Sequence, residues 1–132
     1  MTNSQYVTLL MFFRLKSRMK ILNLIFINLN MEELTQEEWL SQLENDDNAV
    51  VLDVRTDAEV ADGIIPNAIH IDIYKGQEFI DEVDALDKSK NYYVYCRSGN
   101  RSGKACQIME ELGFENAYNL LGGMLEWEGD IE

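Results

Sequence analysis

The residues best suited to chemistry in this sequence are Cys96 and the polar turn that follows it. The apolar run Tyr92–Tyr95 ends at Cys96, and residues 97–102 then contain two arginines and a glycine. Backbone amides in such a turn, together with Arg97 and Arg101, favour a thiolate over a thiol. Because a thiolate is a nucleophile, we predict that Cys96 is reactive and has a lowered pKa, rather than being an inert buried cysteine.

The turn after Cys96 is also the predicted binding site for an anion. Arg97 and Arg101 are expected to act as electrostatic clamps, and the amides of residues 98–102 are expected to donate hydrogen bonds. The complete predicted loop is Arg97, Ser98, Gly99, Asn100, Arg101 and Ser102.

The elements on either side of Cys96 predict how the loop is positioned. Tyr92–Tyr95 is rich in aromatic and β-branched side chains and predicts a buried strand, whereas Lys104–Leu112 repeats apolar groups at helical spacing. Cys96 would therefore lie at the carboxyl end of a strand, where a loop that enters a helix N-terminus binds ligands in α/β proteins.

The rest of the chain alternates predicted strands and helices. A capping box formed by Thr35 and Glu38 begins a helix that runs to about Leu43, and Ala49–Leu52 is an apolar run typical of a buried parallel strand. The remaining expected elements are a short helix at 56–59, a short strand around 69–71, a helix at 77–86, a strand at 117–120 and a short helix at 124–128. This order predicts a compact α/β domain with a mainly parallel sheet flanked by helices.

Other polar residues are assigned structural roles. Asp53 and Arg55 are expected to pair with each other or with loop amides, since buried charges persist when they are paired. His70 is expected to face solvent without a catalytic role, and Cys106 to pack inside the helix. Gly122 and its neighbour Gly123 would let the backbone pass close to the Cys96 loop.

Charge and length restrict the function further. Residues 1–30 hold four basic and no acidic side chains, so residues 31–132 have seven basic against 24 acidic ones, a formal charge of −17. This charge disfavours nucleic acid as a partner. The two apolar runs in residues 1–30 are each too short to span a membrane, so no stable membrane association is expected.

The domain boundary is expected at Met31. Residues 1–30 are interpreted as a non-native or disordered extension, and residues 31–132 as the folded domain. With two cysteines, a disulfide framework is not expected, and a reducing cytoplasm fits best. No metal or organic cofactor is expected.

A series of short motifs resembles the successive signatures of single-domain rhodanese sulfurtransferases. They are Asp53-Val54-Arg55, Glu59, Gly63-Ile64-Ile65-Pro66-Asn67-Ala68, Val94 to Ser102, Ala105, Leu112-Gly113-Phe114, Leu121-Gly122-Gly123 and Trp127. Each motif alone is weak, but their order and spacing are specific, and the similarity covers Met31 to about Trp127. The family often has histidine and glycine where this chain has Ile64 and Asn67, a difference in a turn away from Cys96.

The resemblance implies a sulfurtransferase. Cys96 would take a sulfane sulfur from an anionic donor such as thiosulfate, hold it as a persulfide, and pass it to cyanide or to a protein thiol such as a thioredoxin or a sulfur carrier. Two alternatives stay open, a phosphatase or arsenate reductase of related fold and a non-catalytic binding module. Four residues separate Cys96 from Arg101, one fewer than is general in cysteine phosphatases, so the loop favours sulfur over a phosphoryl group.

Overall fold

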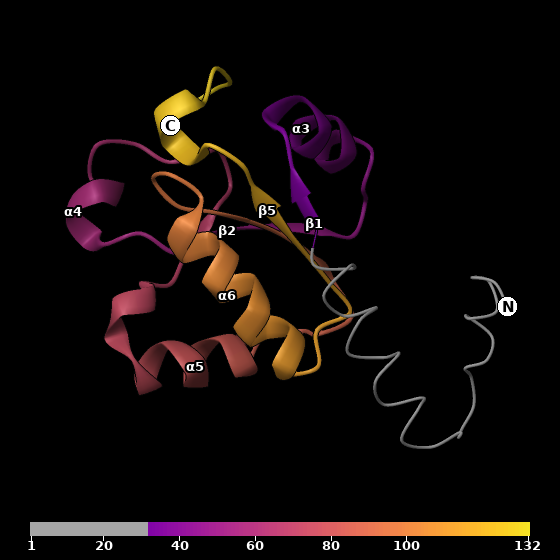
Figure 1. Ribbon diagram of the computed structural model, residues 1–132, viewed down its shortest axis with the longest axis vertical. Helices are drawn as coiled ribbons and strands as arrows, with labels where there is room; N and C mark the ends of the chain where they lie inside the picture. Colours follow the sequence, from indigo (N-terminus) through magenta and orange to yellow (C-terminus); the bar gives the residue numbers. More distant parts are fainter. Residues whose placement is uncertain (1–31) are drawn as a thin grey trace, which may run out of the picture. The chain divides into compact units, whose positions relative to one another are not determined.

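The computed structural model describes residues 32–132, which form a five-stranded sheet with helices on both faces (Figure 1). The strands are β1 (Glu32–Leu34), β2 (Ala49–Asp53), β3 (Ile69–His70), β4 (Asn91–Tyr95) and β5 (Asn116–Leu120). The α-helices are α3 (Gln36–Glu44), α4 (Asp57–Val60), α5 (Gln77–Asp84) and α6 (Asn100–Glu111), and the two 3₁₀ turns are η2 (Ile73–Lys75) and η3 (Gly123–Glu126).

The sheet brings the carboxyl ends of its central strands to one edge. Its order is β1-β5-β4-β2-β3, and every neighbouring pair is parallel. In the register of β2 with β4, Asp53 lies opposite Tyr95, so the residues that follow both strands emerge side by side. Loops at this edge are where open α/β sheets bind ligands, and Cys96 is the first residue after β4.

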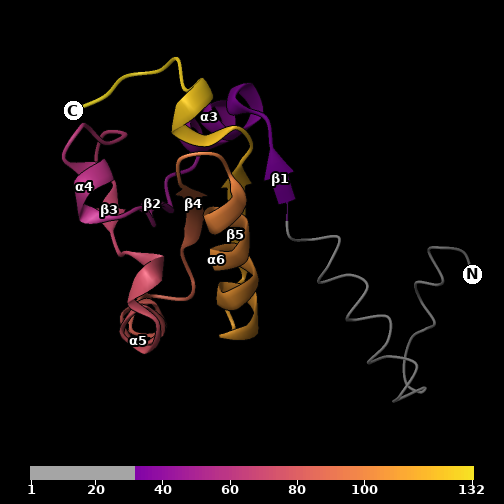
Figure 2. The same cartoon turned by 60° about the vertical axis from the view of Figure 1, so that its left-hand side comes forward.

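Two apolar cores hold the helices on the sheet. On one face α5 and α6 pack through side chains such as Phe79, Val83 and Met109, each at most 1% exposed. On the other face Trp39 of α3 is fully buried against Tyr93 and Tyr95. Figure 2 shows α3 beside the C-terminal segment, and the two separate cores place α6 on the opposite face of the sheet from α3. Successive side chains of β4 point into the two cores in turn, Tyr92 and Val94 into one and Tyr93 and Tyr95 into the other. Because both faces of the strand are buried, its sequence is continuously apolar.

The sequence predicts this architecture with several errors of detail. The edge strand β1 was not predicted, because Glu32–Leu34 has only one apolar side chain and its pairing with β5 is a long-range contact. The helix after Cys96 begins at Asn100 instead of Lys104, so its first turn is part of the loop. The last helix is a 3₁₀ turn at Gly123–Glu126.

The prediction about residues 1–30 falls outside the described part of the chain. Within residues 32–132, no helix has the length and hydropathy needed to cross a bilayer.

Candidate functional site

Cys96 lies at the centre of a ring of hydrogen-bond donors. Its Sγ accepts from the backbone amide of Gly99 at 3.1 Å and from that of Ser102 at 3.4 Å. The Ser102 hydroxyl lies 3.3 Å from the same sulfur. The residue is 0% exposed, so the sulfur sits beneath the loop instead of on its surface. The loop is therefore an anion-binding nest that encloses one sulfur atom.

These donors set the ionisation of Cys96. Burial opposes the charged form, but hydrogen bonds from the Ser102 hydroxyl and from the amides of Ser102, Gly99 and Ser98 outweigh it, and the pKa of the thiol is lowered. The direction agrees with the prediction from the sequence. The predicted contribution of the loop amides agrees with these contacts, but Arg97 and Arg101 are not among the main causes of the shift, and the Ser102 hydroxyl was not predicted.

A buried asparagine shapes the loop from below. Asn119 of β5 is 1% exposed, and its Nδ2 donates to the Gly99 carbonyl at 3.0 Å. The Ser102 hydroxyl lies 2.5 Å from Asn119 Oδ1 as well as close to Cys96 Sγ. A hydroxyl has one proton, so Asn119 and the sulfur compete for it. Asn119 was not recognised from the sequence, because its partners are distant in the chain.

Arg101 forms an ion pair with Glu59, which the sequence does not predict. Its two terminal nitrogens each donate to one carboxylate oxygen at 2.8 Å. The guanidinium of Arg101 is the main cause that lowers the pKa of Glu59 to about 2. Glu59 also closes the capping box of α4 with Thr56, which fixes its position. Arg101 is therefore one half of a bidentate ion pair within the loop and not a free clamp.

The other side of the loop rests on the C-terminal segment. The amides of Met124 and Leu125 donate to the carbonyls of Cys96 and Arg97, both at 3.0 Å. A Cβ on Gly123 would come within 2.5 Å of these same carbonyl oxygens, so this close approach requires glycine. The prediction that the double glycine passes along the Cys96 loop is confirmed. Arg97, Ser98 and Asn100 are exposed around the loop.

The neighbouring charges at the end of β2 are structural. The Arg55 guanidinium binds both oxygens of Asp53 at 2.7–3.1 Å and donates to the Gly63 carbonyl at 2.7 Å. The predicted pairing is confirmed. His70 is more enclosed than predicted, since its Nε2 lies 2.6 Å from the Arg55 carbonyl and its side chain is 25% exposed. The neighbouring Ile69 is instead the exposed residue, because β3 is a two-residue edge strand.

Cys106 takes no part in this site. It is fully buried in the core beside α5, and burial raises the pKa of its thiol. Both cysteines are free. The prediction that Cys106 is a packing residue agrees with its environment, and its raised pKa makes it a weak nucleophile.

Two cavities flank the loop. One, of about 330 Å³, is lined by Ile73, Tyr74, Asn100, Arg101 and Lys104. The other, of about 250 Å³, is lined by Arg55, Glu59, Asp62, Gly63, Arg97, Met124 and Leu125. Each includes residues of the loop, although Cys96 itself lines neither cavity.

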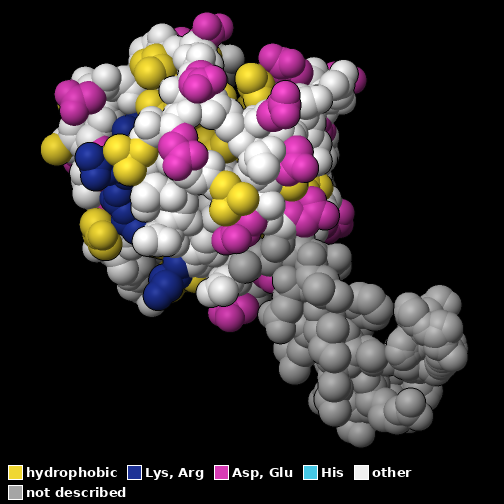
Figure 3. Space-filling model, turned by 45° about the horizontal axis from the view of Figure 1, so that its top comes forward, with side chains coloured by type: hydrophobic (Ala, Val, Ile, Leu, Met, Phe, Trp, Pro, Cys, Tyr) yellow, Lys and Arg dark blue, Asp and Glu magenta, His cyan; other side chains and the backbone are white. Residues whose placement is uncertain are grey.

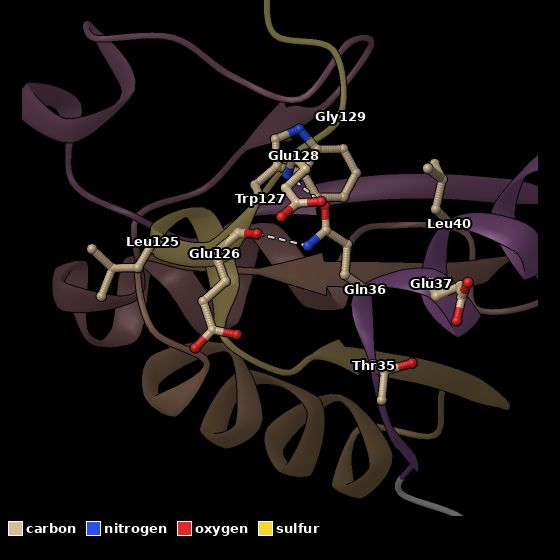
Figure 4. Close-up of a pocket in the computed structure, with 9 residues that line it drawn as sticks. All are labelled: Thr35, Gln36, Glu37, Leu40, Leu125, Glu126, Trp127, Glu128 and Gly129. Carbon is tan, nitrogen blue, oxygen red and sulfur yellow. Dashed lines mark hydrogen bonds between the residues drawn. The ribbon is translucent and has the colours of Figure 1, made fainter.

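A larger cavity of about 870 Å³ lies elsewhere, between the start of α3 and the C-terminal segment (Figure 4). There the Gln36 side chain donates to the Glu126 carbonyl at 2.7 Å and accepts from the Glu128 amide at 2.5 Å. These bonds fasten the C-terminal segment to α3. No residue of the Cys96 loop lines this cavity. Across residues 32–132, no cluster of His, Cys, Asp and Glu has the geometry to hold a metal ion.

Comparison with known proteins identifies the family. The model of the rhodanese-like domain matches residues 36–130. The chain belongs to the rhodanese-like domain family. YtwF of Bacillus subtilis is 37% identical over 104 residues, a match that covers 79% of this chain and 97% of YtwF. A protein of Allochromatium vinosum named sulfurtransferase is 31% identical over 97 residues, covering 74% of this chain and 88% of that protein.

A solved structure supports the same assignment. The rhodanese-like domain protein of Staphylococcus aureus superposes with a TM-score of 0.67 at 34% identity, covering 77% of this chain and 97% of that one. The resemblance drawn from the sequence motifs, and the fold class with it, are thus confirmed.

Proposed function

We propose that this rhodanese-like protein is a sulfurtransferase that carries a sulfane sulfur on Cys96. The observation that carries the proposal is the nest around the sulfur, in which two amides and a hydroxyl converge on Cys96 Sγ. Such a nest favours the thiolate needed for attack and stabilises the negative persulfide that follows. Membership of the rhodanese-like family and the name of the Allochromatium relative support the same chemistry.

The proposed reaction has two balanced steps. In the first, the Cys96 thiolate attacks the outer sulfur of thiosulfate, an S–S bond forms to Cys96, and sulfite leaves with the electron pair of the broken bond. In the second, cyanide attacks the outer sulfur of the persulfide, thiocyanate leaves, and the Cys96 thiolate returns. No external oxidant or reductant is consumed. The loop amides hold the sulfur that bears the negative charge in each resting state.

The burial of Cys96 restricts the donor. Because the residue is 0% exposed, Sγ is not accessible to a large donor in this structure. A slender anion with a terminal sulfur fits such a site better than a bulky ester. Once loaded, the outer sulfur lies about 2 Å beyond Sγ, the length of an S–S bond, and so closer to an acceptor.

The experiment is a side-by-side assay of thiosulfate-to-cyanide transfer and aryl phosphate hydrolysis, with intact mass spectrometry after incubation with thiosulfate. We expect the mass to rise by one sulfur atom, thiocyanate to form, and phosphate ester to stay intact. The variant Cys96→Ser should gain no sulfur, whereas Cys106→Ser should gain it as the wild type does. A wild-type protein that gains no sulfur but turns over the phosphate ester would make the phosphatase alternative the correct one.

A further inference from the structure

The basic residues of the domain gather at the edge of the sheet that carries Cys96. Of the seven Lys and Arg side chains in residues 31–132, five lie at the carboxyl ends of the strands, on the segments that follow β2, β3 and β4; they are Arg55, Lys75, Arg97, Arg101 and Lys104. The remaining two, Lys88 and Lys90, lie in the connection that enters β4 from its other end. Figure 3 shows Lys and Arg side chains along one side of the visible face and acidic side chains over the rest.

Three of the five basic groups are available to a partner. Arg55 is paired with Asp53 and Arg101 with Glu59. Within residues 32–132, no carboxylate lies within salt-bridge distance of Lys75, Arg97 or Lys104. We call these three residues the basic rim. The rim is unusual on a domain with a formal charge of −17, and its charge is directed outward.

Two exposed apolar side chains stand beside the basic rim. Tyr74 is 69% exposed and lines the cavity that also contains Lys104, and Leu125 is 59% exposed and lines the cavity that contains Arg97. An exposed tyrosine among cations is typical of protein interfaces, where aromatic residues and arginine are enriched. A small anionic donor bound in the amide nest would not need a contact with either side chain.

We propose that the basic rim, with Tyr74 and Leu125, docks an acidic protein whose cysteine accepts the sulfur from Cys96. The inference rests on the proposed function and names the class of acceptor. Three cations suit a compact acidic patch, whereas a nucleic acid would extend its phosphates over the acidic surface around the rim. Surface charges act over about 8 Å at physiological salt, so the rim, not the net charge, decides the local complementarity.

The transfer itself is balanced. The acceptor thiolate attacks the outer sulfur of the Cys96 persulfide, the bond between the two sulfurs of the persulfide breaks, and Cys96 leaves as a thiolate. The outer sulfur, with its negative charge, remains on the acceptor as a new persulfide, so no proton donor or redox partner is consumed. The nest that lowers the pKa of Cys96 also makes it a good leaving group.

The test uses full-length protein loaded with thiosulfate and two synthetic cysteine peptides, one flanked by glutamates and one by lysines, compared at equal thiolate concentration. Sulfur leaving the protein is followed by mass spectrometry, and transfer to cyanide is measured in parallel. We expect the glutamate peptide to react about tenfold faster than the lysine peptide at low salt, and the difference to shrink as salt is added.

A matched pair of variants locates the effect. The double substitution Lys75→Glu with Lys104→Glu should reduce the ratio of the rates with the glutamate and the lysine peptide to about one. It should slow transfer to cyanide by less than about threefold. Lys88→Glu with Lys90→Glu changes the net charge equally and should keep the preference. Equal rates for the two wild-type peptides, or equal loss in both double variants, would overturn the docking inference while cyanide transfer stands. Failure of the wild type to load sulfur would instead overturn the proposed function, and the inference with it.

Discussion

Replacing Ser102 by alanine tests how the nest controls Cys96. Ser102 is fully buried, and its hydroxyl is the only side-chain donor within reach of Cys96 Sγ in the described part of the chain. The substitution removes this donor while the Gly99 and Ser102 amides remain. We therefore expect Ser102→Ala to raise the pKa of the Cys96 thiol, because the thiolate loses part of its stabilisation and burial still opposes it.

The magnitude follows from the geometry. A hydrogen bond to a charged group contributes about 1.5–3 kcal/mol. The contact to sulfur is 3.3 Å long and competes with Asn119 Oδ1, so the lower end of this range applies. Since one pKa unit corresponds to about 1.4 kcal/mol, the expected increase is about one unit. At neutral pH the thiolate fraction, and with it the rate of sulfur loading, should fall by up to about tenfold.

Ultraviolet absorbance of the thiolate, followed across pH, measures this shift without requiring a reagent to reach the buried sulfur. Cys106 does not interfere, because its own pKa is raised. The tyrosines of the sheet also titrate later than usual, since burial raises the pKa of Tyr92, Tyr93, Tyr95 and Tyr118. The absorbance change that is absent in Cys96→Ser is assigned to Cys96. At moderate pH it should therefore be separated from the titration of Cys106 and of these tyrosines.

The variant Asn119→Ala is the matched control. It leaves the Ser102 hydroxyl free to donate to Cys96 Sγ alone, so the pKa of the thiol should stay the same or fall. The variant should instead lose about 1–3 kcal/mol of unfolding free energy, because the Gly99 carbonyl loses its buried donor. If Ser102→Ala leaves the pKa unchanged, or if both variants raise it equally, the hydroxyl is not the donor that matters.

Gly123→Ala should destabilise the domain by about 2 kcal/mol more than Gly113→Ala, measured by denaturant titration, which is the magnitude expected for overpacking. Both glycines have positive φ, but only a Cβ on Gly123 meets backbone oxygens at 2.5 Å. Equal losses of stability in the two variants would contradict this close approach. Glu59→Gln should cost up to about 1 kcal/mol at pH 7. Because Arg101 lowers the pKa of Glu59 to about 2, the stability from this pair is fully present above the usual carboxylate pKa and is lost as pH falls from there through about 2. The stabilities of the wild type and the variant should therefore converge in acid. A difference in stability that persists at the lowest pH would refute this linkage. Expression from Met31 should preserve the thermal midpoint and sulfur transfer, and aggregation of the shortened chain would show that residues 1–30 matter.

Local patterns explain what the sequence predicted correctly. The strand that ends at Cys96 and the capping boxes of α3 and α4 depend on neighbouring residues, so spacing alone reveals them. The pairing of Asp53 with Arg55 is also local, since only one residue lies between them in the chain. The core followed from apolar periodicity, although β1 did not, because an edge strand of three residues carries almost no pattern.

The contacts that tune the site were missed for the opposite reason. Glu59 lies 42 residues before Arg101, and Asn119 lies 17 residues after Ser102, so only the fold brings each pair together. Polar side chains at these positions look like ordinary surface residues in a single sequence. Ser102 and Asn119 are distinguished by their burial, and Glu59 and Arg101 by their ion pair, and both features depend on tertiary packing.

Residues close to Cys96 in the sequence and residues distant from it therefore have different roles in the site. The short loop after Cys96 supplies the donors that stabilise a negative sulfur, and it does so through backbone amides that depend little on side-chain identity. The distant residues hold that loop at fixed curvature: Asn119 from below, Gly123 from the side and Glu59 through Arg101. A change in a distant residue should consequently act on stability first, whereas loss of the Ser102 hydroxyl should act first on the ionisation of Cys96. The opposite behaviour of Ser102→Ala and Asn119→Ala, measured in the same titration, separates these two levels of control.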